Sequence, residues 1–189
     1  MTKQEFASRL QNACAAVTAA EQELTEIDSR FGDADHGLTM SKIAKAISAA
    51  AGESEGGIQA MLDDAAMAVM VLNGGSAVPL WNTWLDGLQE EAPEGNEIDT
   101  AGIQAIFAKA LKALSDMSGA KVGDKTMMDA LIPASEAVAA YTGDSADELF
   151  DAAAQAAAQG RRLRSSMSPN SAGPRVTGPR PSAPRTRVR

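Results

Sequence analysis

The chain has 189 residues, with 25 acidic residues against 17 basic ones, a formal net charge of −8 and one cysteine, Cys14. The length suits one domain with a tail. The lone cysteine excludes an internal disulfide framework and fits a reducing compartment. No run of about 18 apolar residues and no apolar leader is present, so we expect a cytoplasmic protein without a membrane partner. Eight arginines fall in residues 161–189, which leaves residues 1–160 strongly acidic and argues against nucleic-acid binding by the main body.

Apolar residues recur every three or four positions along most of the chain, which predicts amphipathic helices. In chain order, the predicted helices lie around residues 3–27, 40–47, 58–72, 80–88, 103–114, 124–141 and 145–153. Thr2 and Glu5 have the spacing of a capping box that starts the first helix. No segment alternates with period two for long enough to form a strand. We therefore expect an all-α fold of seven or eight helices. Short loops join them at residues 28–37, 52–57, 73–78, 89–99, 118–124 and 142–144.

The C-terminal segment differs in composition from the rest of the chain. Residues 161–189 hold five of the eight prolines, carry arginine as their only basic residue type and show no apolar period. Such a segment cannot bury enough surface to offset its ordering entropy, so we predict disorder. It is interpreted as a solvated tail, a basic arm or a segment foreign to the domain. The predicted division is therefore a helical domain over residues 1–160 and a tail over residues 161–189.

Three aspartates gather in the loop after the first predicted helix. Asp28 closes that helix, and Asp33 and Asp35 follow in the sequence GDADHG. In an extended loop, alternate residues point the same way, so these carboxylates can face one point. Close carboxylates repel one another unless a cation is present, and hard oxygen ligands suit Mg²⁺. The alternative is a plain turn that caps the next helix. The only histidine, His36, cannot form a two-histidine metal site or a catalytic triad within this chain.

Two further glycine-containing loops precede predicted helices. Residues 73–77 read NGGSA and come just before Pro79. They are interpreted either as an anion cradle, with the Ser76 hydroxyl, or as a plain turn. Residues 118–129 read SGAKVGDKTMMD, in which Lys121 and Lys125 could meet a phosphate or only balance the acidic surface. If the helices run up and down, these loops and the acidic loop gather at one end.

The three loops together resemble one known family. GDADHG with an aspartate five residues upstream, GGS-x-x-PLW and GDKTM-x-DAL-x-PA occur in this order. They resemble the nucleotide-binding L subunit of dihydroxyacetone kinase, the DhaL or DAK2-domain family, and the resemblance covers roughly residues 1–160. It implies a barrel of eight antiparallel helices with the nucleotide at one end.

The resemblance also implies site residues. Two Mg²⁺ ions would be held by Asp28, Asp33 and Asp35. The nucleotide, ADP or ATP, would be contacted by His36, Gly37, Leu38, Thr39, Ser76, Ala77, Gly119 and Met127. The histidine that anchors the substrate carbonyl belongs to a separate K subunit in this family, so no catalytic residue is assigned in this chain.

The resemblance implies transfer of a phosphoryl group to a small ketose held on the K subunit. We expect Mg-bound ADP to act as a coenzyme that a phosphotransferase-system M subunit rephosphorylates. The histidine of GDADHG is the feature that favours this mode. The alternatives are an ATP-dependent dihydroxyacetone or erythrulose kinase subunit, or a docking and regulatory module without activity. A homodimer is also compatible with the resemblance.

Two departures from the family pattern stand out. The second loop reads GGSAVPL where the family more often has GGSSGPL, so Ala77 lacks a hydroxyl and Val78 replaces a glycine. The family also ends with a segment that closes over the nucleotide. Because the resemblance stops near Gly160, we expect this chain to lack that lid and to lack its last helix.

Overall fold

The computed structural model describes residues 1–30 and 32–166. Over these residues it contains eight α-helices and no strand, with a single isolated bridge between Thr2 and Glu97. The all-α prediction is therefore confirmed. The helices are α1 (Lys3–Ala19), α2 (Glu21–Asp28), α3 (His36–Glu53), α4 (Ile58–Met70), α5 (Ala77–Glu90), α6 (Thr100–Ser118), α7 (Met128–Ala140) and α8 (Ala146–Ser166).

The first predicted helix, over residues 3–27, is in fact two. The break is at Ala20, whose N–H is shared between the carbonyls of Ala16 and Val17. No glycine or proline marks this position, so nothing in the local sequence signals it. The break lets α2 pack against the start of α3, where an added Cβ on Gly37 would lie 2.1 Å from the Glu21 carbonyl oxygen.

The helix predicted around residues 145–153 is α8, and it continues to Ser166, past the predicted boundary at residue 160. The count of eight comes from the division of the first predicted helix into α1 and α2. The expected loss of the family's last helix and lid stays a prediction. Residues 161–166 contain no glycine or proline, so the helical hydrogen bonds propagate through them. The rest of the predicted tail, residues 167–189, lies outside the described residues.

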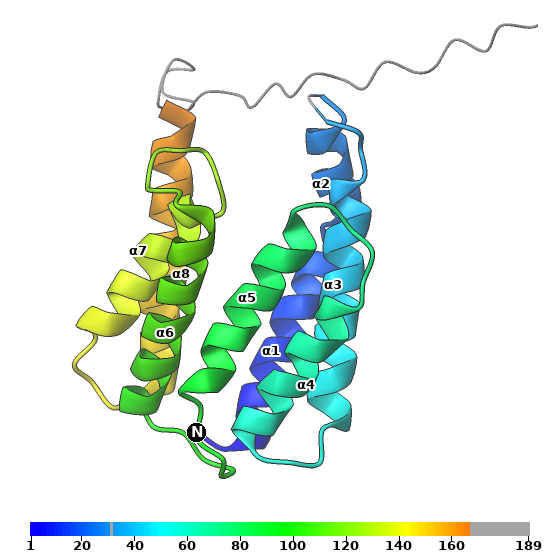
Figure 1. Cartoon of the computed structure of the whole chain (residues 1–189). Helices are drawn as coiled ribbons and strands as arrows, with labels where there is room; N and C mark the ends of the chain where they lie inside the picture. The colour runs from blue at the N-terminus through cyan, green and yellow to red at the C-terminus, as the bar shows by residue number, and fades with distance from the viewer. Residues whose placement is uncertain (31, 167–189) are drawn as a thin grey trace, which may run out of the picture.

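Consecutive helices from α3 to α8 run up and down and pack on their neighbours, while α1 packs mainly on α3 (Figure 1). Close crossings depend on small residues. Gly87 of α5 faces α6, where an added Cβ would lie 2.5 Å from the Ala110 Cα. The first and last helices are joined by Arg9 of α1, which pairs with Asp147 and lies over the Phe150 ring of α8 at 5.6 Å from its centroid.

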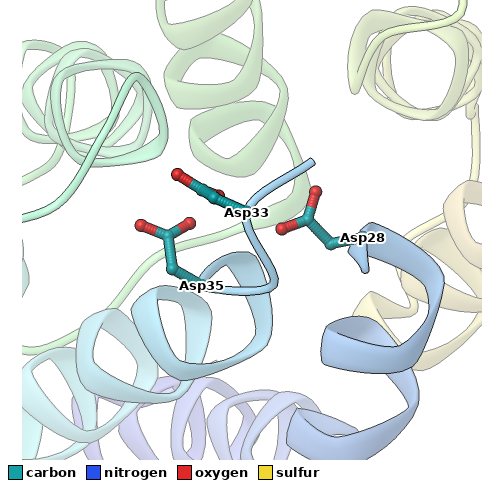
Figure 2. A group of neighbouring side chains, drawn as sticks. All are labelled: Asp28, Asp33 and Asp35. Carbon is teal, nitrogen blue, oxygen red and sulfur yellow. The ribbon is translucent and has the colours of Figure 1, made fainter. Parts of the chain in front are cut away.

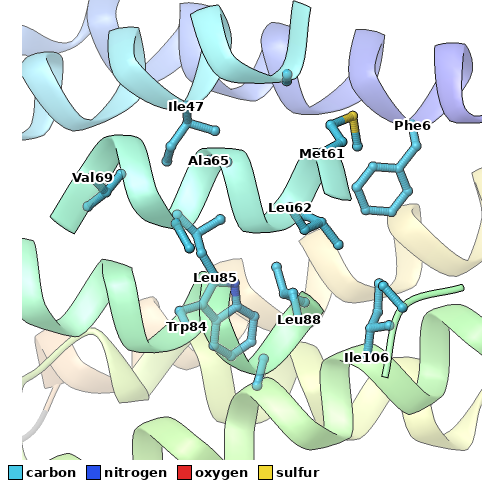
Figure 3. Packing of buried hydrophobic residues seen from close by; sticks show 14 of the residues in the cluster. Phe6, Ile47, Met61, Leu62, Ala65, Val69, Trp84, Leu85, Leu88 and Ile106 are labelled. Carbon is cyan, nitrogen blue, oxygen red and sulfur yellow. The ribbon is translucent and has the colours of Figure 1, made fainter. Parts of the chain in front are cut away.

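The core is largely aliphatic, since aromatic residues make up only 4% of the chain. It runs along the middle of the bundle, where the apolar face of α4 packs against α3 and α5 (Figure 3). Its fully buried large side chains include Ile58, Met61, Leu62, Ile103, Ile106, Leu114 and Leu149. Burying one such side chain stabilises the fold by about 1.5–3 kcal/mol. None of the described helices combines the length and the apolarity needed to cross a membrane.

Candidate functional site

The three predicted loops lie at the same end of the bundle, which we call the loop end (Figure 1). It consists of residues 29–35, 71–76 and 119–127, which connect α2 to α3, α4 to α5 and α6 to α7. Helices α3, α5 and α7 all begin there. Each helix N-terminus carries a partial positive charge and free N–H groups, so the loop end is suited to bind anions.

The acidic loop brings its three aspartates together. One carboxylate oxygen from each of Asp28, Asp33 and Asp35 lies within 4.8 Å of the others (Figure 2). The backbone route differs from the prediction of an extended loop, because Ala34 has a left-handed conformation with φ 64°. This conformation is uncommon for a residue with a side chain and costs about 1–2 kcal/mol. The turn at Ala34 places the carboxylates on either side of it near one point.

The negative charges in this cluster repel one another. Asp33 hydrogen-bonds to Asp35 and repels its ionised form, and Asp28 adds further repulsion, so the pKa of Asp35 is raised above its ordinary value. Asp33 and Asp35 are exposed, whereas Asp28 is half-buried. Three close carboxylates form a donor set of hard oxygens with space for water, which is what Mg²⁺ requires. The residues present therefore fit a divalent cation.

Asp28 also has a structural role. Its Oδ2 accepts a hydrogen bond from the His36 N–H at 3.3 Å and so caps α3 across the loop. Gly32 lets the backbone pass close to this carboxylate, since an added Cβ would lie 2.1 Å from Asp28 Oδ1. The carboxylate is thus held in place by its own loop.

The predicted nucleotide residues at the start of α3 occupy different environments. His36 and Leu38 are exposed at the loop end. Gly37 is buried against α2, which gives it a packing role. Thr39 is 7% exposed and meets the second loop, where an added Cβ on Gly74 would lie 2.8 Å from its Cγ2. The second loop therefore lies against the start of α3.

In the second loop, Ser76 is the exposed N-cap residue of α5, and its side chain makes no capping hydrogen bond. Ala77 is half-buried, and Val78 is 7% exposed and belongs to the core. The valine that departs from the family pattern therefore points into the protein. Ser76 itself is exposed at the loop end.

The third loop carries the other two predicted contacts and lies across the bundle from the acidic loop (Figure 1). Gly119 ends α6 with φ 63°, and an added Cβ there would meet nothing within 4 Å. Met127 is half-buried and packs against the core. Sequence reasoning assigned no role to Asp129, which the structure buries directly behind this loop. The sequence signal that could have singled out Asp129 is its position as an acidic residue among the apolar residues at the start of a predicted helix.

Comparison with known proteins identifies relatives. The profile of the DAK2 domain family matches residues 30–176. The match begins just after Asp28 and runs past Gly160, where the sequence analysis expected the resemblance to end. A D-erythrulose kinase of Mycolicibacterium smegmatis is 34% identical over 159 residues, which cover 82% of this chain and 27% of the relative.

An L-erythrulose kinase of Pectobacterium atrosepticum is 35% identical over 163 residues, covering 81% of this chain and again 27% of the relative. This chain therefore spans about a quarter of the length of these kinases. The ADP-binding subunit DhaL of a PEP-dependent dihydroxyacetone kinase of Listeria innocua is 26% identical over 136 residues, or 71% of this chain and 67% of that subunit.

A solved structure shares the fold. The dihydroxyacetone kinase from C. freundii, in complex with AMP-PNP and Mg²⁺, superimposes with a TM-score of 0.59 at 21% identity over 85% of this chain and 33% of that one. The family profile covers most of the chain, in agreement with the predicted resemblance. The chain belongs to the DAK2 domain family.

Proposed function

We propose that this chain is the nucleotide-binding subunit of a kinase of the dihydroxyacetone type, which transfers a phosphoryl group to a small ketose. The observation that carries the proposal is the cluster of three carboxylates, with oxygens within 4.8 Å, beside the N-terminus of α3. An acidic cluster on an acidic protein repels a nucleotide unless a metal ion lies between them. Metal and nucleotide would therefore bind together.

In this proposal Asp28, Asp33 and Asp35 hold two Mg²⁺ ions. When bound, Mg²⁺ neutralises charge that develops on the transferred phosphoryl group. The N-terminal N–H groups of α3 and α5 face the phosphates. The nucleotide is contacted by His36, Gly37, Leu38, Thr39, Ser76, Ala77, Gly119 and Met127.

A K-type partner subunit supplies the ketose and the catalytic histidine. The exposed large apolar side chains of the described residues support docking at the loop end, because all lie in its loops or in the adjoining helix turns. They are Ile27, Leu38, Met67, Met70, Val71, Met117 and Val122, each 46–74% exposed. Exposed large apolar side chains gathered at one end of a domain are typical of an interaction site.

The proposed donor is tightly held ADP, rephosphorylated in place by a phosphotransferase-system M subunit. The Listeria innocua relative is named an ADP-binding subunit, and this chain spans 67% of it. A second candidate is an ATP-dependent ketotetrose kinase, which is favoured by the higher identity, 34%, to a D-erythrulose kinase.

The test is to purify the protein in Mg²⁺, denature it and identify released nucleotide by chromatography. Near-stoichiometric ADP supports the coenzyme mode. Protein without nucleotide that binds Mg-ATP saturably in calorimetry supports the second candidate. Protein that neither retains nor binds a nucleotide contradicts both and leaves a docking module. With a K-type subunit added, the rates at which dihydroxyacetone and erythrulose are phosphorylated then show which ketose is the substrate.

A further inference from the structure

Asp129 is the only buried acidic residue of the described chain, at 3% exposed. It is the second residue of α7, and its Oδ1 accepts a hydrogen bond from the Gly123 N–H at 2.5 Å. Its Oδ2 is also buried and has no hydrogen-bond partner among the described residues. A buried carboxylate with one unpartnered oxygen is costly, although the N-terminus of α7 offsets part of that cost. An apolar residue would pack there at lower cost, so a conformational role explains the aspartate better than stability does.

The loop that Asp129 contacts has an unusual backbone. Gly123 has φ 101° and Lys125 has φ 60°, and the second value is uncommon for a residue with a side chain. Such a conformation persists only where the surroundings impose it. The turn between Lys121 and Asp124 has hydrogen bonds of its own, but these are exposed. The bond from the buried Gly123 to the buried Asp129 carboxylate ties the middle of this loop to α7.

The backbone of Asp129 is held from the other side. Pro133, four residues later in α7, has no N–H to donate to the Asp129 carbonyl. Helix α8 packs against that carbonyl through Gly160, where an added Cβ would lie 2.0 Å from the oxygen. Asp129 therefore connects the third loop to α7 through its side chain and to α8 through its main chain.

We propose that Asp129 is a positioning residue of the nucleotide site, which holds the loop of residues 119–127 in its binding conformation through the Gly123 N–H. The inference rests on the proposed function, because this loop carries Gly119 and Met127. Asp129 touches neither metal nor nucleotide. Without it the loop samples other conformations, and the nucleotide must order the loop on binding. The metal site, on a different loop, is unaffected.

The experiment compares Asp129→Ala with Asp129→Asn, whose amide oxygen still accepts from the Gly123 N–H. Ser135→Ala is the matched control, since Ser135 is buried in the same helix with an unpartnered hydroxyl. Three quantities are measured well below the unfolding temperature. They are Mg-ADP affinity by calorimetry, affinity for Mn²⁺ alone by paramagnetic resonance, and amide hydrogen exchange at Gly123.

We expect Asp129→Ala to weaken Mg-ADP binding about tenfold or more. It should also abolish exchange protection at Gly123 and leave Mn²⁺ affinity unchanged. Asp129→Asn should restore both nucleotide binding and protection, and Ser135→Ala should match the wild type. A folded Asp129→Ala variant that binds Mg-ADP like the wild type overturns the inference, as does an Asn variant as weak as the Ala variant.

If Asp129→Ala does not fold, Asp129→Glu keeps the charge but displaces the carboxylate by one methylene. Wild-type binding by that variant would equally overturn the inference. Wild-type protein that binds neither Mg-ADP nor Mg-ATP contradicts the proposed function itself. In that case, hydrogen exchange at Gly123 still tests whether Asp129 anchors the loop. Retained protection of the Gly123 amide in Asp129→Ala would contradict the anchoring.

Discussion

The two ends of the bundle use their backbone hydrogen bonds differently. At the end opposite the loop end, which we call the far end, α1 has a complete capping box between Thr2 and Glu5. Asp99 caps α6, and Ser145 accepts from the first turn of α8. Helix α4 is capped by backbone, since Ile58 donates to the Gly95 carbonyl at 2.9 Å. Every helix that begins at the far end therefore has donors satisfied within the protein.

At the loop end, by contrast, the N-cap residues of α3, α5 and α7 make no side-chain capping bond. This end also carries the three mutually repelling carboxylates, the left-handed Ala34 and the exposed apolar side chains. Other side chains reach the first N–H of two of these helices, Asp28 at α3 and Thr126 at α7, whereas no such bond is seen at α5 among the described residues. The comparison teaches that the far end uses its capping groups for folding, whereas the loop end keeps mutually repelling carboxylates and exposed apolar side chains that folding alone does not require.

The largest effect is expected from Asp33→Asn combined with Asp35→Asn. Loss of even an outer partner of a metal site costs about 10–100-fold in affinity, so loss of two ligands should weaken Mg-nucleotide binding more than about 100-fold. Calorimetry measures it. The matched control is Asp63→Asn with Asp64→Asn, which removes the same charge from exposed positions of α4. Equal weakening by both pairs would mean that net charge matters and the cluster does not.

A large effect on stability alone is expected at the far end from Gly57→Ala. An added Cβ would lie 1.9 Å from the Glu94 carbonyl oxygen, so this overpacking should lower the free energy of unfolding by about 1–3 kcal/mol. Gly95→Ala is the control, because its Cβ meets nothing within 4 Å. Denaturant unfolding measures both. Nucleotide affinity of the folded Gly57→Ala protein should stay at the wild-type value, and a loss would show that the ends are coupled.

A pair of smaller changes compares the two ends directly. Thr2→Ala removes a capping box and should cost about 1 kcal/mol of stability without changing nucleotide affinity. Ser76→Ala removes a hydroxyl that caps nothing, so its stability should change by less than about 0.5 kcal/mol. Its Mg-ADP affinity should fall by several-fold, as expected for one hydrogen bond. Reversed results would remove the distinction between the ends.

The smallest effect concerns pH in the presence of a chelator. The raised pKa of Asp35 means that its carboxyl group binds a proton more tightly in the folded state than in the unfolded state. Its contribution to stability is therefore present at low pH and is lost as pH rises through that pKa. Asp33→Asn removes the main cause, so its melting temperature should rise relative to wild type between about pH 4 and pH 7. A pH-independent difference would contradict this sign.

Much of the fold follows from the sequence because amphipathic periods and capping residues are local signals. The Thr2 and Glu5 capping box is confirmed, and the predicted loops lie where the chain reverses. The break at Ala20 had no local signal, because it depends on how α2 packs against Gly37. The boundary at residue 160 was placed by composition, but helix propagation is decided residue by residue and reaches Ser166.

In the candidate site, too, local signals were predictive and features that depend on tertiary packing were not. Spacing predicted that Asp28, Asp33 and Asp35 could meet, and their oxygens do. The predicted extended route is wrong, since the left-handed Ala34 makes the turn. Asp129 was missed because burial of a carboxylate is a property of the assembled helices, and its partner Gly123 is known only once the loop is folded.

The most direct test of the contrast between the two ends is to add Mg-ADP to isotope-labelled protein and map backbone amide shifts by NMR. We expect the large shifts to cluster in residues 29–39, 73–78 and 119–129, with residues 1–8, 54–57 and 91–99 unchanged. Removal of Mg²⁺ should reverse them. Saturable shifts concentrated at the far end, or shifts at the loop end that do not need Mg²⁺, would contradict the account.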